Sequence, residues 1–372
     1  MRVVVVGAGP IGVAAALLAS ERGHAVTLVE AGVVGQSLRR WGRRTRFFTP
    51  LAMNLPPSLL ARVPAELHQA LLSGPEMATL VLEPLAVLLG ERLRLHTRLR
   101  SVGRVRLSRI DLPAHPLRAE RPFRLLVDGP HGEEYLEADR VLDASGTYGQ
   151  PLAAGAGGLA ALGEAKLGGR IHHHLDALDL ALGRLLVLGH GLSAATALVQ
   201  LSEAPPTEVT WAIRSAHLRP IVETACDPLP ERQRIATLAN QLASSPPSWL
   251  HVHRRTQLEA LATDGDAVRA RLTNGIELHV DQVLSFTGYR PDLRPLDELA
   301  LDIAADTEGP QRLHRKVATV TDCLSLPSVT RSDLESGEPG FHFLGQKSYG
   351  RGRSFLLQTG LAHLEQLLDA MI

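Results

Sequence analysis

The feature that most constrains the fold is a glycine-rich turn between an apolar strand and a helix near the start of the chain. Residues 2–6 form a mostly β-branched run, which is typical of a strand buried on both faces of a parallel sheet. The turn spans Gly7–Gly12, residues 13–22 follow as a predicted helix, and residues 24–30 form a second apolar strand. This order predicts a βαβ unit, the setting in which such a turn binds a dinucleotide.

The residues of this turn suit that task. Gly7 permits a tight reversal, Gly9 leaves room for a pyrophosphate, and Gly12 lets the helix pack close to the strand. From Pro10 the helix N-terminus offers unpaired N–H groups and partial positive charge to a diphosphate. Glu30 ends the second strand, where its carboxylate can accept both hydroxyls of an unphosphorylated ribose. The alternative is a turn that only joins a strand to a helix, and the terminal acid favours dinucleotide binding.

The same pattern returns in the second half of the chain. Residues 184–188 read as a strand, Gly189–Ala194 as the turn, residues 195–201 as the start of a helix, and residues 208–213 as the next strand. Alanine replaces the third glycine, which the fingerprint tolerates. The second strand ends in Arg214 rather than an acid, and a guanidinium can pair with a 2′-phosphate. The second turn therefore predicts an NADPH site, unless Arg214 is a solvated charge.

The two halves also close alike. Hairpins around residues 128–132 and 273–275 precede the strands 139–146 and 281–288. Each closing strand has an acid, then Val-Leu, then a Ser/Thr-Gly pair. This internal duplication predicts an α/β protein. We expect two Rossmann-like dinucleotide-binding domains, each a parallel sheet with a β-hairpin or meander, the second inserted in the first.

A site with a ribose-binding acid and a separate site with an arginine imply two different dinucleotides. FAD in the first and NADPH in the second is the combination that supports chemistry, because hydride then passes from nicotinamide to flavin. We expect an FAD-binding domain in residues 1–168, an NAD(P)H-binding domain in residues 169–290, and a return to the FAD-binding domain in residues 291–372.

Composition narrows the function further. The chain carries 39 basic and 39 acidic residues, so its bulk charge predicts no nucleic-acid or membrane partner. Glycines interrupt both long apolar stretches, so we expect a soluble protein without a membrane span. The two cysteines, Cys226 and Cys323, lie far apart in sequence, which excludes a disulfide framework and a zinc knuckle and favours a cytoplasmic location.

Both glycine turns and both closing strands together resemble the two-dinucleotide-binding-domain flavoproteins, which include flavin-containing monooxygenases and thioredoxin-reductase-like enzymes. Further stretches are similar to a bacterial set of FAD/NAD(P)-binding oxidoreductases of poorly characterised function: Trp41–Pro50, Asp143–Thr147, Gly189–Ala195, Gly345–Arg351 and Phe355–Leu357. The resemblance covers nearly the whole chain.

The resemblance implies a set of cofactor contacts. For FAD these are Gly7, Gly9, Pro10, Gly12, Glu30, Ser37, Trp41, Ser145, Gly146, Gly345, Ser354 and Phe355. For NADPH they are Gly189, Gly191, Ser193, Ala194 and Arg214. It also implies a final helix from about Ser354 whose N-terminus faces the pyrimidine end of the flavin. Gln346 stands where disulfide-reductase relatives carry an aspartate on the ribityl chain.

The chemistry follows partly by elimination. The resemblance implies that disulfide reductases of this group carry a redox-active Cys-x-x-Cys beside the flavin, and because this chain has none, we expect no thiol–disulfide chemistry. We expect NADPH to reduce FAD and the flavin to activate O₂ as a C4a-(hydro)peroxide that oxygenates a small molecule. The FxGxxxH monooxygenase motif is not reproduced; the nearest stretch is residues 168–172. A reductase or dehydrogenase with the same cofactors and a non-catalytic redox sensor therefore remain alternatives, and a homodimer is left open.

No single acid, base or nucleophile stands out, which fits chemistry carried by a cofactor. The candidates are Asn54 as a hydrogen-bond donor near the flavin, and Lys347 and Arg351 as cations for an anionic substrate or reduced flavin. The two cations could equally be solvated loop charges. The histidines of residues 172–174 and 251–253 lack nearby cysteine or carboxylate partners, so we expect surface or linker histidines and no metal.

Overall fold

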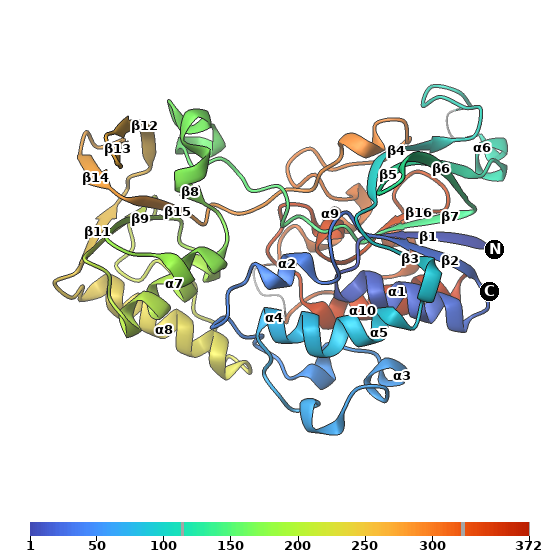
Figure 1. Ribbon diagram of the computed structural model, residues 1–372, viewed down its shortest axis with the longest axis horizontal. Helices are drawn as coiled ribbons and strands as arrows, with labels where there is room; N and C mark the ends of the chain where they lie inside the picture. Colours follow the sequence, from blue (N-terminus) through green and yellow to red (C-terminus); the bar gives the residue numbers. More distant parts are fainter. Residues whose placement is uncertain (113–114, 321–323, 372) are drawn as a thin grey trace.

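The computed structural model describes residues 1–112, 115–320 and 324–371, and within them the chain builds two parallel sheets (Figure 1). The first sheet has the strand order β16-β7-β1-β2-β3 and the second β11-β10-β9-β15-β8. Because the strands of the second sheet lie in sequence between β7 and β16, the second domain is inserted in the first. The predicted α/β class with two Rossmann-like domains is confirmed. The strands are β1 Arg2–Val6, β2 Ala25–Val29, β3 Leu93–Arg94, β7 Arg140–Asp143, β16 Phe341–Phe343, β8 Ile171–His172, β9 Arg184–Leu188, β10 Glu208–Ile213, β11 Leu250–Arg254 and β15 Gln282–Ser285.

Each parallel sheet is covered on one face by an antiparallel sheet. In the first domain Val4 and Val6 pack against Val102 and Phe123, and in the second Leu186 and Leu188 pack against Val268. The two predicted hairpins, β5–β6 and β13–β14, belong to these covering sheets. Their strands are β4 Arg98–Arg104, β5 Phe123–Gly129, β6 Gly132–Ala138, β12 Leu258–Asp264, β13 Ala267–Leu272 and β14 Glu277–Val280.

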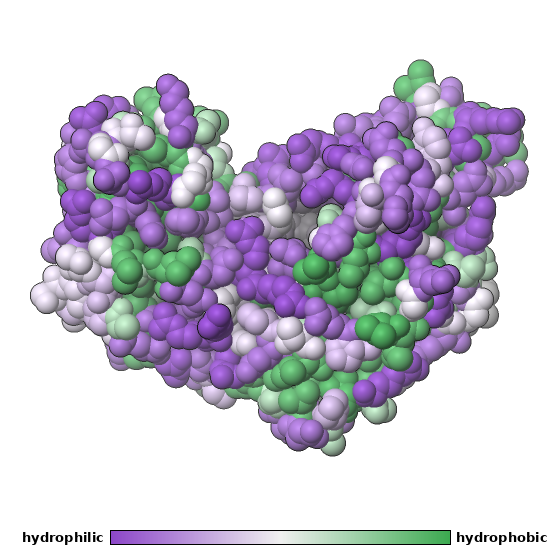
Figure 2. Space-filling model, in the orientation of Figure 1, coloured by the Kyte–Doolittle hydropathy of each residue, from purple (hydrophilic) through white to green (hydrophobic). Residues whose placement is uncertain are grey.

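Helices cover the opposite faces. α1 (Pro10–Glu21) and α10 (Leu357–Asp369) pack on the first sheet, and α7 (Leu192–Glu203) and α8 (Pro230–Ser244) pack on the second (Figure 1). No helix in the described part of the chain is long and apolar enough to cross a membrane. On the face drawn in Figure 2, a notch separates the two domains and apolar surface gathers over α5 (Glu83–Val87).

The remaining elements are short. Residues 74–87 form a continuous run of α4, the π-helix η3 and α5. The short helices are α2 Gln36–Arg39, η1 Leu51–Met53, α3 Pro57–Leu60, η2 Ala65–Leu67, α4 Gly74–Glu76, η3 Met77–Leu82, η4 Gly90–Arg92, α6 Pro116–Glu120, η5 Ala156–Gly158, η6 Glu164–Arg170, η7 Leu175–Leu180, η8 Arg294–Leu296, α9 Gln311–Val317, η9 Arg331–Leu334 and η10 Gly345–Tyr349.

Two segments cross between the domains side by side. The Leu152 N–H donates to the Gly288 carbonyl at 2.9 Å, and the Arg290 N–H donates to the Gln150 carbonyl at 2.9 Å. After the first crossing, residues 154–167 pack against the second domain, where Ala154 joins its core. The limits at residues 168 and 290 remain our proposed division of the chain.

One predicted boundary is wrong. The final helix begins at Leu357 and not near Ser354. The Ser354 hydroxyl donates to the Val320 carbonyl at 3.0 Å instead of capping the helix. Gly350, with a φ of 57°, and the turn after it keep residues 350–356 out of the helical conformation.

Candidate dinucleotide sites

The first turn needs glycine at two positions and leaves a third open. Gly7 has a φ of 97°, and a Cβ there would lie 2.7 Å from the Ala144 carbonyl oxygen. A Cβ on Gly12 would lie 1.8 Å from the Gly7 carbonyl oxygen. A Cβ on Gly9 would meet no described atom within 4 Å, so space stays open before the N-terminus of α1, where Pro10 begins the helix. An open cradle at a helix N-terminus fits a diphosphate.

The second turn repeats this geometry. Gly189 has a φ of 104°, and a Cβ there would lie 2.4 Å from the Phe286 carbonyl oxygen. Gly191 has open space, and Ser193 lies in the first turn of α7. Ala194 is fully buried, so the third position accommodates a methyl group. α1 and α7 each have 12 residues and begin directly after the glycine that faces the open space.

A buried tryptophan supports the second turn, which the sequence alone did not indicate. The Trp211 indole Nε1–H donates to the Gly189 carbonyl oxygen at 2.7 Å, and Trp211 is fully buried in β10. Because β10 pairs with β9, Trp211 lies beside the strand that leads into the turn. A large aromatic residue in the strand after the turn was the only signal in the sequence.

The two sites differ in charge. The Glu30 carboxylate accepts N–H bonds from Ala8 at 2.7 Å and from Gly32 at 2.8 Å, so the backbone holds it beside the first turn. A carboxylate has about four lone-pair sites, so acceptor capacity remains for ribose hydroxyls. At the second site Arg214 is exposed and makes no hydrogen bond or ion pair within the described residues. Its positive charge is therefore open to an anion.

The segment after Glu30 carries two predicted flavin contacts. The Gly35 N–H donates to the Ala8 carbonyl at 2.9 Å, which ties α2 to the first turn. Ser37 on α2 is exposed. Trp41 is partly buried, with its ring centroid 4.7 Å from that of Phe47.

The C-terminal return brings further predicted residues to the first turn. Gly345, with a φ of 63°, packs against Ile11, and a Cβ on Gly360 would lie within 3 Å of both Ile11 and Phe355. Phe355 therefore lies near the start of α1. The Ser354 hydroxyl, in contrast, donates its hydrogen bond to the Val320 carbonyl.

Lys347 is neither a solvated loop charge nor a free cation. It is 3% exposed, and its ammonium donates to Asp143 Oδ2 at 2.7 Å and to Ser145 Oγ at 2.9 Å. Ser145 itself is exposed, and Gly146 beside it, with a φ of 70°, has open space around its Cα. The expectation that Lys347 touches a substrate is not met in this arrangement, because burial and the two partners fix the ammonium inside the protein.

The other two catalytic candidates also have structural partners. The Asn54 amide donates to the carbonyls of Thr49 and Pro50, which holds the loop and uses both N–H groups. Arg351 pairs with Glu308 at 2.8 Å on the surface. Although burial opposes its ionisation, the hydrogen bonds from Arg351 and Arg290 lower the pKa of Glu308.

The histidines of residues 172–174 are only partly as expected. His174 is 4% exposed, and its Nδ1 lies 3.1 Å from the Tyr289 hydroxyl beside the crossing segments. Burial lowers the pKa of His174 to about 4, so the ring is neutral near pH 7. Among the described residues no three His, Cys, Asp or Glu side chains are placed to hold a metal ion.

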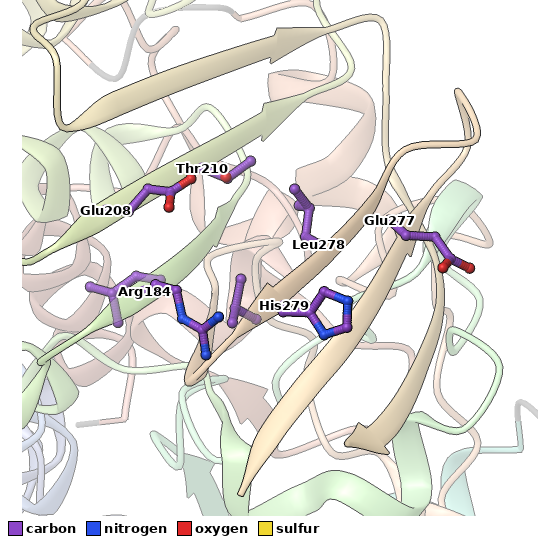
Figure 3. Close-up of a pocket in the computed structure, with 8 residues that line it drawn as sticks. Arg184, Glu208, Thr210, Glu277, Leu278 and His279 are labelled. Carbon is purple, nitrogen blue, oxygen red and sulfur yellow. The ribbon is translucent and has the colours of Figure 1, made fainter. Parts of the chain in front are cut away.

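A surface cavity of about 240 Å³ lies elsewhere. It is lined by residues of β9, β10 and β14, including Arg184, Glu208 and His279 (Figure 3). Arg184 and Glu208 are the first residues of their strands, so this cavity lies at the amino edge of the second sheet. Ligands of such sheets bind at the carboxyl edge, where both glycine turns lie.

The comparisons with known proteins agree with the fold. A family model described as pyridine nucleotide-disulphide oxidoreductase matches residues 4–58, which contain the first turn and Glu30. No curated protein matches the chain.

Solved structures of both reductases and hydroxylases share the architecture. A bacillithiol disulfide reductase from Bacillus cereus has 15% identity and a TM-score of 0.70, covering 100% of this chain and 99% of its own. A thioredoxin reductase from T. acidophilum has 16% identity and a TM-score of 0.64, covering 99% and 98%. An ornithine N-hydroxylase from Kutzneria sp. 744, whose structure is described with reduced FAD, NADP⁺ and L-ornithine, has 16% identity and a TM-score of 0.65, covering 99% and 98%. These matches confirm the predicted resemblance. At 15–16% sequence identity, what they establish for this chain is the fold.

Proposed function

We propose that the chain is an FAD-dependent oxidoreductase that takes hydride from NADPH and oxygenates a small molecule with O₂. One observation carries the proposal. The strand that follows each glycine turn and helix ends at a charged residue, and the two charges are opposite: Glu30 at the first site and Arg214 at the second. A carboxylate suits an unphosphorylated ribose, and an arginine suits a 2′-phosphate.

The residues of the first site fit FAD. The open space at Gly9 and the N-terminus of α1 would take the pyrophosphate, and Glu30 would accept ribose hydroxyls. Ser145 borders the same turn, and a Cβ on the following Gly146 would meet open space. Bound there, FAD supplies the hydride-accepting and oxygen-activating chemistry that no side chain of this protein provides.

The residues of the second site fit NADPH. Gly191 and α7 would receive the pyrophosphate, while Arg214 would pair with the 2′-phosphate. Burial, together with the charges of Arg214 and Arg353, lowers the pKa of His190 in this turn. A neutral imidazole therefore stands between Gly189 and Gly191 near pH 7.

Oxygenation is favoured over disulfide reduction by the cysteines. The sequence has two, with no Cys-x-x-Cys pair, and Cys226 lies exposed in the second domain, while Cys323 lies outside the described residues. The second candidate is a reductase that passes electrons to an acceptor other than a disulfide. The missing FxGxxxH motif favours this alternative. The homodimer and the cytoplasmic location stay predictions from the sequence.

The test is a two-step reaction of the holoprotein. NADPH added without oxygen should bleach the flavin absorbance, and an O₂ pulse should then give oxygenated product from a panel of primary amines, chosen because one structural neighbour is an ornithine N-hydroxylase. Stoichiometric hydrogen peroxide without product would favour the reductase. No bleaching by NADPH or NADH would overturn both enzyme proposals.

A further inference from the structure

Three residues from two distant parts of the sequence form a polar cluster beside the first turn. Asp143 ends β7, Ser145 follows two residues later, and Lys347 lies in η10 after β16. The Lys347 ammonium bonds Asp143 Oδ2 at 2.7 Å and Ser145 Oγ at 2.9 Å. The Ser145 hydroxyl and N–H both lie within bonding distance of Asp143 Oδ1, at 2.6 and 3.1 Å.

These contacts fix the direction of every hydrogen bond in the cluster. An ammonium has three N–H donors and no lone pair, so Ser145 Oγ must accept from Lys347. The carboxylate of Asp143 only accepts, so the single hydroxyl hydrogen of Ser145 must point to it. One lone pair of Ser145 Oγ remains, which makes this hydroxyl an acceptor toward anything outside the cluster.

Burial separates the roles of the three residues. Asp143 is 0% and Lys347 3% exposed, so neither is open to a ligand, whereas Ser145 is exposed. Ser145 also borders the first turn, because a Cβ on Gly7 would lie 2.8 Å from the Ser145 Cα. Ser145 is therefore the member of the cluster that a bound dinucleotide can touch.

We propose that Lys347 and Asp143 are positioning residues that hold the Ser145 hydroxyl as an acceptor for a hydroxyl or N–H group of FAD. A hydroxyl fixed in this way rejects a phosphate oxygen, which needs a donor, and selects a sugar-like hydroxyl or a ring N–H. Lys347 lies 204 positions after Asp143 in the sequence, and its bond to Asp143 therefore ties the C-terminal return to the region of the first turn. The inference rests on the proposed binding of FAD.

The test measures the dissociation constant of FAD for full-length holoproteins, from the fluorescence of FAD released on dilution. Ser145→Ala leaves the buried ion pair intact and should weaken FAD binding about tenfold, as expected for one hydrogen bond. Lys347→Met should weaken it at least as much. Lys347→Arg keeps the positive charge and N–H donors, so it should weaken FAD binding less than Lys347→Met does.

A double variant shows whether Lys347 acts through Ser145. Adding Lys347→Met to Ser145→Ala should cost no more than about a further twofold if the two residues act as a unit. Asp227→Asn is the matched control, because it breaks a buried ion pair with Arg232 in the second domain. It should lower the melting temperature and leave FAD affinity unchanged.

The outcomes separate this inference from the proposed function. Wild-type protein that binds no FAD refutes the proposed function itself. If wild type binds FAD and Ser145→Ala binds it equally tightly, the inference is overturned while the proposed function stands. Ser145→Ala gives this answer even if Lys347→Met does not fold. Additive losses in the double variant, or a control that weakens FAD as much as Lys347→Met, also overturn it.

Discussion

The indole N–H of Trp211 donates to the carbonyl oxygen of Gly189 at 2.7 Å, which joins the core of the second domain to the first glycine of its turn. Gly189 has a φ of 104° and lies against the Phe286 backbone, so the turn is clamped from two sides. Removing the indole N–H leaves a partly buried carbonyl unpaired, at a cost of about 1–3 kcal/mol. The open space at Gly191 depends on this fixed backbone.

Trp211→Phe should therefore raise the KM for NADPH roughly five- to tenfold, with a smaller change in kcat. FAD affinity should stay unchanged, because the first turn has no contact with Trp211. Steady-state kinetics and FAD titration measure both quantities. Trp249→Phe is the control, since Trp249 is only partly buried and its carbonyl accepts from the Val209 N–H near the start of β10. A rise in KM that is equal in the two variants would contradict a specific role for the indole.

Arg214→Glu should reverse the cofactor preference. A carboxylate repels the 2′-phosphate of NADPH but can accept the ribose hydroxyls of NADH. We expect kcat/KM for NADPH to fall at least about 30-fold, while that for NADH changes by less than about threefold. Arg219→Glu is the comparison variant, because Arg219 already pairs with Glu223 at 2.6 Å. Equal losses with both nucleotides at position 214 would refute the assigned role.

A buried ion-pair cluster centred on Glu338 leads to a prediction about stability. Glu338 is paired with Arg104 at 2.8 Å and Arg118 at 3.0 Å, and all three side chains are almost fully buried. Glu338→Gln leaves two arginines without their counter-charge, which should lower the free energy of unfolding by about 3–5 kcal/mol. Urea unfolding at pH 7 measures this loss. Glu335→Gln, which affects an exposed pair with Arg312, should cost less than about 1 kcal/mol.

The same carboxylate gives a pH dependence. Burial opposes the ionised form, but bonds from Arg118, the Ala300 N–H and Arg104 lower the pKa of Glu338 below its ordinary 4.5. A lowered carboxyl pKa means that the unfolded chain binds the proton more readily, so this stabilisation is complete above pH 4.5 and is lost as pH falls below it. The unfolding free energy of Glu338→Gln should fall less steeply than that of wild type below pH 4.5. Parallel curves would exclude Glu338 as a source of the acid sensitivity.

Sequence reasoning predicted what depends on local pattern. The glycine spacing around Gly7 and Gly189 forces a strand-to-helix turn. Glu30 and Arg214 could be identified because each directly follows the second strand of its βαβ unit. It missed what depends on distant pairing: Lys347 meets Asp143 across 204 positions, and its burial cannot be inferred from a basic loop sequence. The final helix begins at Leu357 rather than near Ser354, because the Ser354 hydroxyl bonds the distant Val320 carbonyl and Gly350 lies in a non-helical turn.

His174 also reflects distant pairing, because its ring packs against Tyr148 and Tyr289 at the crossing segments, with centroids 4.4 and 5.6 Å away. Burial lowers the pKa of His174 to about 4, whereas an unfolded histidine titrates at 6.5. Between these values the unfolded chain binds the extra proton, so stability is complete above pH 6.5 and falls as pH drops toward 4, by at most roughly 3 kcal/mol.

His174→Phe keeps the stacking and removes the titration, so its unfolding free energy should vary less between pH 7 and 4.5. Some slope should remain, because burial also lowers the pKa of His363 to about 4. His251→Asn changes an exposed histidine and is the control, so its unfolding free energy should depend on pH as that of wild type does. If the unfolding free energy of His174→Phe also kept the wild-type pH dependence, the His174 ring would be protonated without cost in the folded protein.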